Sequence, residues 1–194
     1  MKLDIFKSSS CDLPCWNGII VGHTTEKELI SILNNLQIVN KEFPLSPIGG
    51  NGIFEKRYSF TFGKKDNDGQ FPGFSFMHIK NDIVQEIEFI SGFELTVNEA
   101  IEIFDEPEYV FTTYTHSGKI YISLFFPQKG AIVSLIKKQR GADLSEADSI
   151  EVIEIISPSL YDSVVREAYT FDGHMLDFSS WEGFGNLFEK YPPQ

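Results

Sequence analysis

The chain has 194 residues and a formal net charge of −12, and 42% of its residues are hydrophobic. This composition is typical of a globular protein that forms one domain, or two small ones that share a core. The acidic balance argues against nucleic acid and anionic membranes as partners, since both attract basic surfaces. A basic protein partner is compatible with this charge, and plain solubility explains it equally.

The sequence contains no run of about 18 apolar residues, so it predicts no transmembrane segment. Its N-terminus lacks the long apolar stretch of an intact signal peptide. We therefore expect a cytoplasmic protein if the chain is complete, and an envelope or secreted protein if a signal sequence has been trimmed. The sequence does not indicate the oligomeric state.

The only two cysteines are Cys11 and Cys15, which lie in the first, irregular segment of the chain. They can close a local disulfide in an oxidising compartment, or stay as two thiols in a reducing one. A zinc site needs two further ligands, and His23 is the only nearby candidate. The sequence therefore leaves the disulfide and the thiols open, and it predicts no metal site.

The first predicted helix begins near Thr25. Thr25 and Glu28 have the Ser/Thr-x-x-Glu spacing of a capping box, in which the hydroxyl and the carboxylate each accept from a backbone amide. A stripe of apolar residues at helical spacing follows: Leu29, Ile32, Leu33 and Leu36. Residues 40–52 are rich in Pro and Gly and indicate a loop. Three strands are expected next, around residues 57–62, 74–78 and 83–90.

A second helix is predicted from Thr96 to the residue before Pro107, and its Thr96 and Glu99 repeat the capping box. Strands are expected over residues 108–115, 119–126, 130–137 and 149–157. The sequence Ile-Glu-Phe-Ile-Ser at residues 87–91 returns as Ile-Glu-Ile-Ile-Ser at residues 153–157. The helix and strand echoes occur in the same order, which indicates a duplicated helix-then-sheet unit.

The prediction for the whole chain is an α+β protein of two tandem repeats, each a helix packed on an antiparallel meander. The expected boundaries are residues 1–92, 93–157 and 158–194. The third segment holds a helix that begins at Ser157-Pro158 and a tail too aromatic to be free. Trp16 is expected to anchor the first segment, and Trp181 to close one end of the core.

No known catalytic motif occurs in the chain. The sequence has no Gly-x-Ser-x-Gly, phosphate loop or His-Glu-x-x-His, and none of its four histidines has a catalytic spacing to a nearby Cys, Asp or Ser. His78 alternates with Phe74 and Phe76, which favours a core or inter-sheet histidine. The sequence therefore predicts no catalytic residues and no cofactor.

Binding is the function that the strand patterns favour. Tyr114, Tyr121 and Phe125 are mixed with Ser and Thr on two predicted neighbouring strands. A tyrosine-rich, partly polar sheet face suits protein recognition. The competing interpretation is that the C-terminal tail simply covers this face.

Several segments resemble known families. The opening Ile-Ile-Val-Gly-His-Thr-Thr at residues 19–25, followed by a helix and a meander, is similar to the β-lactamase-inhibitor-protein-like fold and to outer-membrane assembly lipoproteins of the SmpA/OmlA type. The chain also resembles uncharacterised bacterial envelope proteins with Pro-Cys-Trp-x-Gly-Ile, Glu-Pro-Glu-Tyr-Val and Trp-x-Gly-Phe-Gly segments, here at residues 14–19, 106–110 and 181–185. The resemblance implies tandem repeats and a non-enzymatic, protein-binding role.

We therefore expect a non-catalytic protein-interaction module of inhibitor, immunity or envelope-associated type. The alternative is a small hydrolase or ligand-binding protein that uses a cleft between the repeats. That alternative predicts a deep polar pocket in which a histidine has a carboxylate neighbour.

Overall fold

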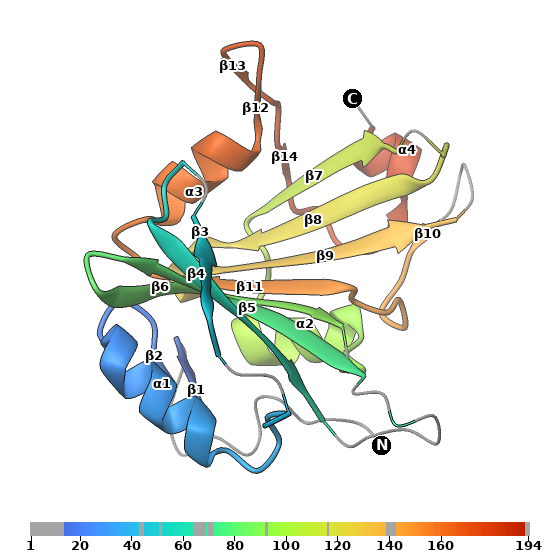
Figure 1. Ribbon diagram of the computed structural model, residues 1–194. Helices are drawn as coiled ribbons and strands as arrows, with labels where there is room; N and C mark the ends of the chain where they lie inside the picture. The colour runs from blue at the N-terminus through green and yellow to red at the C-terminus, as the bar shows by residue number, and fades with distance from the viewer. Residues whose placement is uncertain are drawn as a thin grey trace. The chain divides into compact units, whose positions relative to one another are not determined.

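A computed structural model describes residues 14–42, 45–50, 52–63, 69, 72–91, 93–115, 117–138 and 143–192. The fold is mixed α+β, with mostly antiparallel strands and few helices, which confirms the predicted class (Figure 1). The chain divides into two compact units, residues 1–94 with 154–164 and residues 95–153 with 165–194. In the described part of the chain, no helix has the length and apolar character that crossing a membrane requires.

The first unit contains a small hairpin, one helix and an antiparallel sheet. Its elements are β1 (Cys15–Trp16), β2 (Ile19–Ile20), α1 (Glu26–Asn35), β3 (Pro47–Gly49), β4 (Lys56–Phe62), β5 (Gly73–Lys80) and β6 (Ile83–Ser91). The strands β3, β4, β5 and β6 pair in chain order, each antiparallel to the next. The chain crosses between the two units within β11 (Val152–Ile156) and again within α3 (Tyr161–Ala168).

One face of this sheet forms the core of the first unit. Tyr58, Met77 and Ile87 are paired in register across β4, β5 and β6, and all three are buried. Trp16 is fully buried, and its ring lies 5.2 Å from that of Phe89 and 5.9 Å from that of Phe60. Such close aromatic packing is favourable beyond the area it removes from water. Trp16 is therefore the anchor that the sequence predicts.

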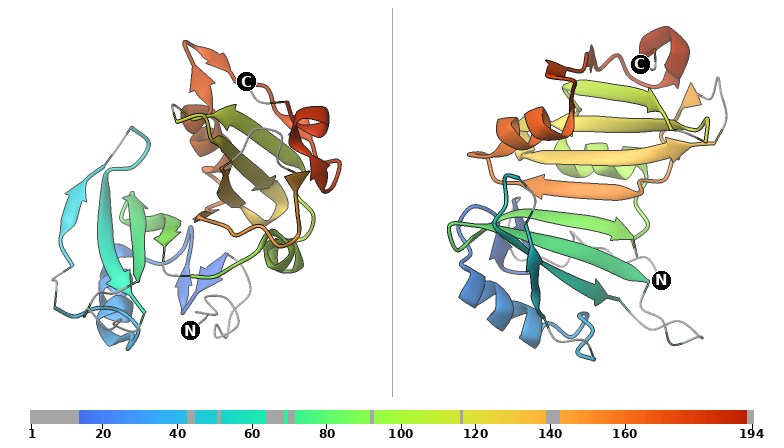
Figure 2. Two further views of the ribbon diagram at one scale, coloured as in Figure 1. Left: turned by 90° about the vertical axis from the view of Figure 1, so that its right-hand side faces the viewer. Right: turned by 45° about the horizontal axis from the view of Figure 1, so that its top comes forward.

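The second unit contains a helix, a three-stranded meander and the C-terminal segment. Its elements are α2 (Val97–Phe104), β7 (Tyr109–Tyr114), β8 (Ile120–Phe126), a 3₁₀ turn (Pro127–Lys129), β9 (Ala131–Lys137), β10 (Asp143–Leu144), β12 (Thr170–Phe171), β13 (His174–Met175), β14 (Ser179–Ser180), β15 (Gly185–Asn186) and α4 (Leu187–Lys190). The strands β14, β7, β8 and β9 lie side by side in that order (Figure 2).

The core of the second unit has an apolar and a polar part. On one side Phe104 of α2 packs against Phe126, with ring centroids 5.4 Å apart. On the other side the buried hydroxyls of Ser123 and Ser134 lie 3.0 Å apart, and Tyr169 donates its hydroxyl proton to Ser123 at 2.9 Å. Each buried hydroxyl thus has a partner, as a low-dielectric interior requires. Tyr169 thereby joins the C-terminal segment to β8.

Both predicted capping boxes are present. Thr25 accepts from the amide of Glu28, whose carboxylate accepts from the amide of Thr25, and Thr96 and Glu99 do the same. The first helical amide also has equivalent partners in the two units: Glu26 donates to the carbonyl of Asp82, and Val97 donates to that of Asp148. The first amide of each helix is therefore hydrogen-bonded to a residue that comes later in the chain and belongs to the same unit.

The start of the third helix differs from the prediction. The pattern Ser157-Pro158 predicts a helix from residue 158, but α3 begins at Tyr161. The amides of Leu160 and Tyr161 both donate to the carbonyl of Ser157, which closes a turn before the helix. The preceding strand is shorter than the predicted 149–157. Residues 149–151 instead form an isolated bridge between Ser149 and Thr96 and two backbone hydrogen bonds, from Ile150 to Leu95 and from Glu151 to Ser134.

Candidate functional site

The three aromatic residues predicted to form a binding face do not share one. In the antiparallel ladder of β7 and β8, Thr113 lies opposite Tyr121 and Tyr109 lies opposite Phe125. Direct partners lie on the same face of a sheet, and successive residues alternate between faces. Tyr114 pairs with Ile120, which places it on the face opposite to Tyr121 and Phe125. The predicted surface of these three residues therefore does not form.

The C-terminal segment covers part of both faces of this ladder. Phe125 is only 2% exposed and packs against Tyr169 and Phe178, at centroid distances of 5.0 and 4.9 Å. On the other face Tyr114 lies 6.3 Å from Phe188. Tyr121 is half-buried. The C-terminal tail therefore covers Phe125, as the competing interpretation expects.

The other predicted structural residues have mixed outcomes. Trp181 is half-buried and stacks on Tyr191 with an interplanar angle of 7° and a centroid distance of 5.9 Å. Tyr191 is itself fully buried and donates its hydroxyl proton to the carbonyl of Gly183. Cys15 is buried. Cys11 lies outside the described residues, so both expectations for the two cysteines, a disulfide or two thiols, stay predictions.

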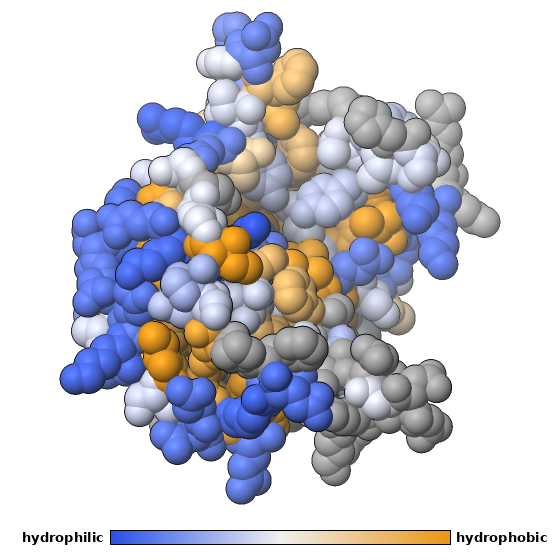
Figure 3. All heavy atoms as spheres, viewed as in Figure 1, coloured by the Kyte–Doolittle hydropathy of each residue, from blue (hydrophilic) through white to orange (hydrophobic). Residues whose placement is uncertain are grey.

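Among the described residues, the large apolar side chain with the highest exposure lies on a short hairpin. The sequence patterns did not predict a site there. Phe171 of β12 is 74% exposed, and Met175 of β13 is 49% exposed. The turn residues Asp172 and Gly173 have φ values of 49° and 78°, as a tight two-residue hairpin requires. Figure 1 shows this hairpin projecting beyond the end of α3, and Figure 3 shows hydrophobic and hydrophilic residues side by side on it.

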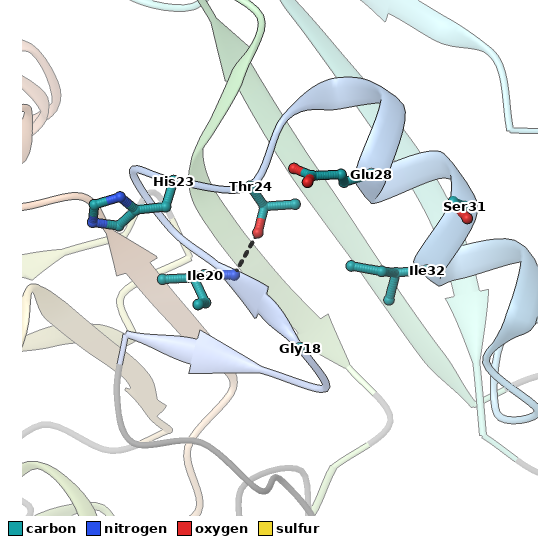
Figure 4. A pocket seen from close by; sticks show the side chains of 7 residues that line it. All are labelled: Gly18, Ile20, His23, Thr24, Glu28, Ser31 and Ile32. Carbon is teal, nitrogen blue, oxygen red and sulfur yellow. Dashed lines mark hydrogen bonds between the residues drawn. The ribbon is translucent and has the colours of Figure 1, made fainter.

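A surface pocket of about 370 Å³ lies in the first unit, between β2 and α1 (Figure 4). His23 and Glu28 both line it, but the Glu28 carboxylate accepts hydrogen bonds from Thr25 in the capping box. Thr24 lies between them and accepts from the amide of Ile20. The carboxylate of this pocket is therefore used to cap the helix, and no hydrogen bond joins it to His23 among the described residues.

A second group of polar residues lies on the sheet of the first unit, on the face opposite to Trp16. Cross-strand pairing aligns Arg57, His78 and Glu86 in one row, and Phe76 and Glu88 in the next. The ligand atoms of His78, Glu86 and Glu88 all lie within 4.8 Å of one another. His78 and Glu86 are 3% and 4% exposed. We call these three residues the His78 cluster.

The His78 ring is held between apolar neighbours. Its centroid lies 4.8 Å from that of Phe54 and 6.0 Å from that of Phe76. Its Nε2 atom is 3.4 Å from Oε2 of Glu88, and its buried Nδ1 atom has no hydrogen-bond partner. An unpaired buried nitrogen destabilises the fold by about 1–3 kcal/mol unless something binds it.

The carboxylates of this region have strongly perturbed pKa values. Burial raises the pKa of the Glu86 carboxyl well above its usual range, and the charges of Glu154 and Glu88 raise it further. Burial also raises the pKa of Glu154 on β11 to about 8, and the Glu88 charge adds to the shift. The guanidinium of Arg57 instead lies over the Phe76 ring at 4.5 Å, and no ion pair of the described residues joins it to these acids.

The sequence carries a partial signal for the His78 cluster. Alternation along β6 places Glu86 and Glu88 on one face of a strand whose other face holds buried Ile87 and Phe89. Two acids on one face of a strand next to a histidine-bearing strand are a candidate site. The Asp172-Gly173 pair is the corresponding signal for the exposed hairpin.

Comparisons with protein-family models, with curated proteins and with solved structures found no match.

Proposed function

We propose that this protein is a non-catalytic protein-interaction module that binds its partner through the hairpin of β12 and β13. The observation that carries this proposal is the 74% exposure of Phe171. Aromatic side chains that enter a partner's pocket dominate the binding energy of many protein interfaces. A single exposed apolar residue is common on protein surfaces. This hairpin carries two, because Met175 is exposed as well as Phe171.

The register of the hairpin indicates the shape of the partner's site. Phe171 pairs with His174, and Thr170 pairs with Met175. Neighbouring pairs face opposite sides of a ribbon, so Phe171 and Met175 point to opposite sides of this one. A ribbon with apolar groups on both sides is best buried in a cleft, since a flat surface covers only one side. The net charge of −12 favours a cleft with a basic rim.

The base of the hairpin is fixed to the second unit. Leu176 donates its amide proton to the carbonyl of Tyr169 at 2.9 Å, and the Tyr169 hydroxyl donates to Ser123. The Tyr169 ring also packs against Phe111 at 5.1 Å. A binding element held in place before association loses less conformational freedom on binding. This supports a preformed hairpin as the binding element.

We further propose that the fold is the expected tandem repeat of a helix and an antiparallel meander. Two equivalent capping boxes support it, as do the equivalent backbone hydrogen bonds from Glu26 to Asp82 and from Val97 to Asp148. The expected inhibitor, immunity or envelope-associated role agrees with an acidic protein that presents one apolar hairpin. A partner of basic character is the corresponding expectation.

The test is site-specific photo-crosslinking in a lysate of the source organism. A photoreactive phenylalanine replaces Phe171 in one variant and Ile48, an exposed apolar residue of the first unit, in a control. We expect a single stoichiometric partner from position 171 and not from position 48, and loss of its binding in Phe171→Ser. Equal crosslinking from both positions overturns the proposal. No stoichiometric partner, together with turnover in a broad hydrolase screen, supports the hydrolase alternative instead.

A further inference from the structure

We infer that the His78 cluster binds a divalent transition-metal ion through one nitrogen of His78 and one carboxylate oxygen each of Glu86 and Glu88. The donor atoms converge on one face of β5 and β6, within 4.8 Å of one another. The site does not include the exposed hairpin, so metal binding and the proposed protein interaction are tested separately.

The distances need only a small adjustment to enclose an ion. Ligand atoms about 2.1 Å from a tetrahedral zinc ion are roughly 3.4 Å apart. Nε2 of His78 and Oε2 of Glu88 already lie 3.4 Å apart. The remaining distances, up to 4.8 Å, shorten by rotation of the glutamate side chains. The backbone register that aligns His78 with Glu86 stays unchanged.

The burial of the donors points to a ligand rather than to a solvated acidic patch. His78 and Glu86 are almost inaccessible, and the buried Nδ1 of His78 has no hydrogen-bond partner. Because Nε2 of His78 lies next to Glu88, Nε2 is the nitrogen placed to bind the ion, and the unpaired Nδ1 is the nitrogen that a metal-bound histidine offers to a second partner. The Glu88 side chain is 24% exposed, which provides a path for the ion from solvent.

Charge supports a cation at this position. Glu86, Glu88 and the nearby Glu154 bring three acids into one region of the sheet. Among the described residues, the only ion-pair partner of these acids is His78, which pairs with Glu88 and is charged only when it is protonated. Buried carboxylates are stable when they are paired or coordinate a metal. A divalent ion at this position compensates for burying the carboxylate of Glu86. Arg57 does not supply this charge, since its guanidinium lies over Phe76.

The donor set selects the class of metal. Imidazole nitrogen with carboxylate oxygen suits zinc, iron and manganese, whereas calcium and magnesium prefer sites made of oxygen alone. With three protein ligands, a fourth position is left for water or for Glu154. The depth of the site favours a structural ion that ties β5 to β6.

The test is cobalt binding to the full chain, followed by zinc competition. We expect one Co²⁺ per chain with visible absorption bands, their removal by Zn²⁺, and a higher melting temperature with Zn²⁺. His78→Gln, Glu86→Gln and Glu88→Gln should each weaken Co²⁺ binding at least about tenfold. Glu106→Gln, at an exposed acid outside the cluster, should bind Co²⁺ as the natural protein does.

Circular dichroism of each variant in the presence of a chelator establishes that the variants fold. Absence of stoichiometric Co²⁺ binding by the natural chain overturns the inference. Binding that is unchanged in the three folded variants overturns it as well, because the ion then lies elsewhere. Neither result affects the crosslinking expected from Phe171.

Discussion

His78 and Glu86 are direct cross-strand partners on β5 and β6, yet the imidazole of His78 makes its described polar contact with Glu88, the acid two residues further along β6. The pairing is diagonal. In consequence, no ion pair of the described residues neutralises Glu86, although its side chain is buried. This arrangement makes the stability of the ion-free protein depend on pH.

We expect the free energy of unfolding, measured with a chelator, to fall as the pH rises from about 4.5 to about 8. The pKa of Glu154 is about 8 in the folded protein against an ordinary value of 4.5, so between these limits the folded protein holds a proton that the unfolded chain has released. This stabilisation is complete below pH 4.5 and is lost above pH 8. The raised pKa of Glu86 acts in the same direction.

Glu154→Gln tests this dependence by urea unfolding at pH 5 and pH 8.5. The amide stays neutral, so we expect the variant to gain about 2 kcal/mol relative to the natural protein between the two pH values, less than the full shift implies because Glu154 is partly accessible. The charges that couple to Glu154 are those of Glu88 and Glu86, and both acids are unchanged in the variant. Glu106→Gln should follow the natural protein at both pH values. Identical profiles for Glu154→Gln and the natural protein would contradict the prediction.

Thr25→Ala and Thr96→Ala should each lower the free energy of unfolding by about 1 kcal/mol, because each removes the hydroxyl that accepts from the third helical amide. Chemical denaturation of both variants measures the loss. Ser163→Ala, at an exposed position of α3, is the matched control and should change stability little. A control that loses as much as the two threonine variants would show that capping is not the cause.

The features that depend on residues close together in the sequence could be predicted, whereas those that depend on how the strands pair could not. A capping box depends on residues three positions apart, so Thr25 with Glu28 and Thr96 with Glu99 are visible in the sequence. The face that Tyr114 occupies depends on the register of β7 and β8, and a change of one residue in the turn transfers a strand's side chains to the other face. Single-strand alternation therefore cannot place Tyr114 beside Tyr121.

The same limit applies to the candidate sites. Alternation correctly groups His78 with Phe74 and Phe76, but its acidic neighbours come from β6, which only pairing brings to it. The sequence echo aligns Glu88 with Glu154 without indicating that both carboxylates act on Glu86. The aromatic content of the C-terminal tail predicts that the tail packs on the core, but Phe171, next to the tight Asp172-Gly173 turn, is exposed to solvent.

Trp16→Phe should lower the free energy of unfolding by about 2 kcal/mol, because the smaller ring leaves a cavity among Phe60, Phe62 and Phe89. Trp181→Phe should lower the free energy of unfolding by less than half as much. Trp181 is only half-buried, and the fully buried ring on which it stacks is that of Tyr191. The two variants also separate the fluorescence of the two tryptophans. We expect the emission of Trp16 at the shorter wavelength, and the reverse order would place Trp16 outside the core.

Tyr169→Phe should lower the free energy of unfolding by about 1 kcal/mol, because it removes the hydroxyl that donates to Ser123 inside the second unit. The ring remains, so its packing on Phe111 and Phe125 is retained. Urea unfolding measures the loss, and Tyr109→Phe, at an exposed tyrosine, is the matched control. Amide hydrogen exchange of Leu176, which donates to the carbonyl of Tyr169, reports whether the base of the hairpin loosens. Faster exchange at Leu176 in Tyr169→Phe alone is expected, and equal exchange in both variants would separate the hairpin from this hydroxyl network.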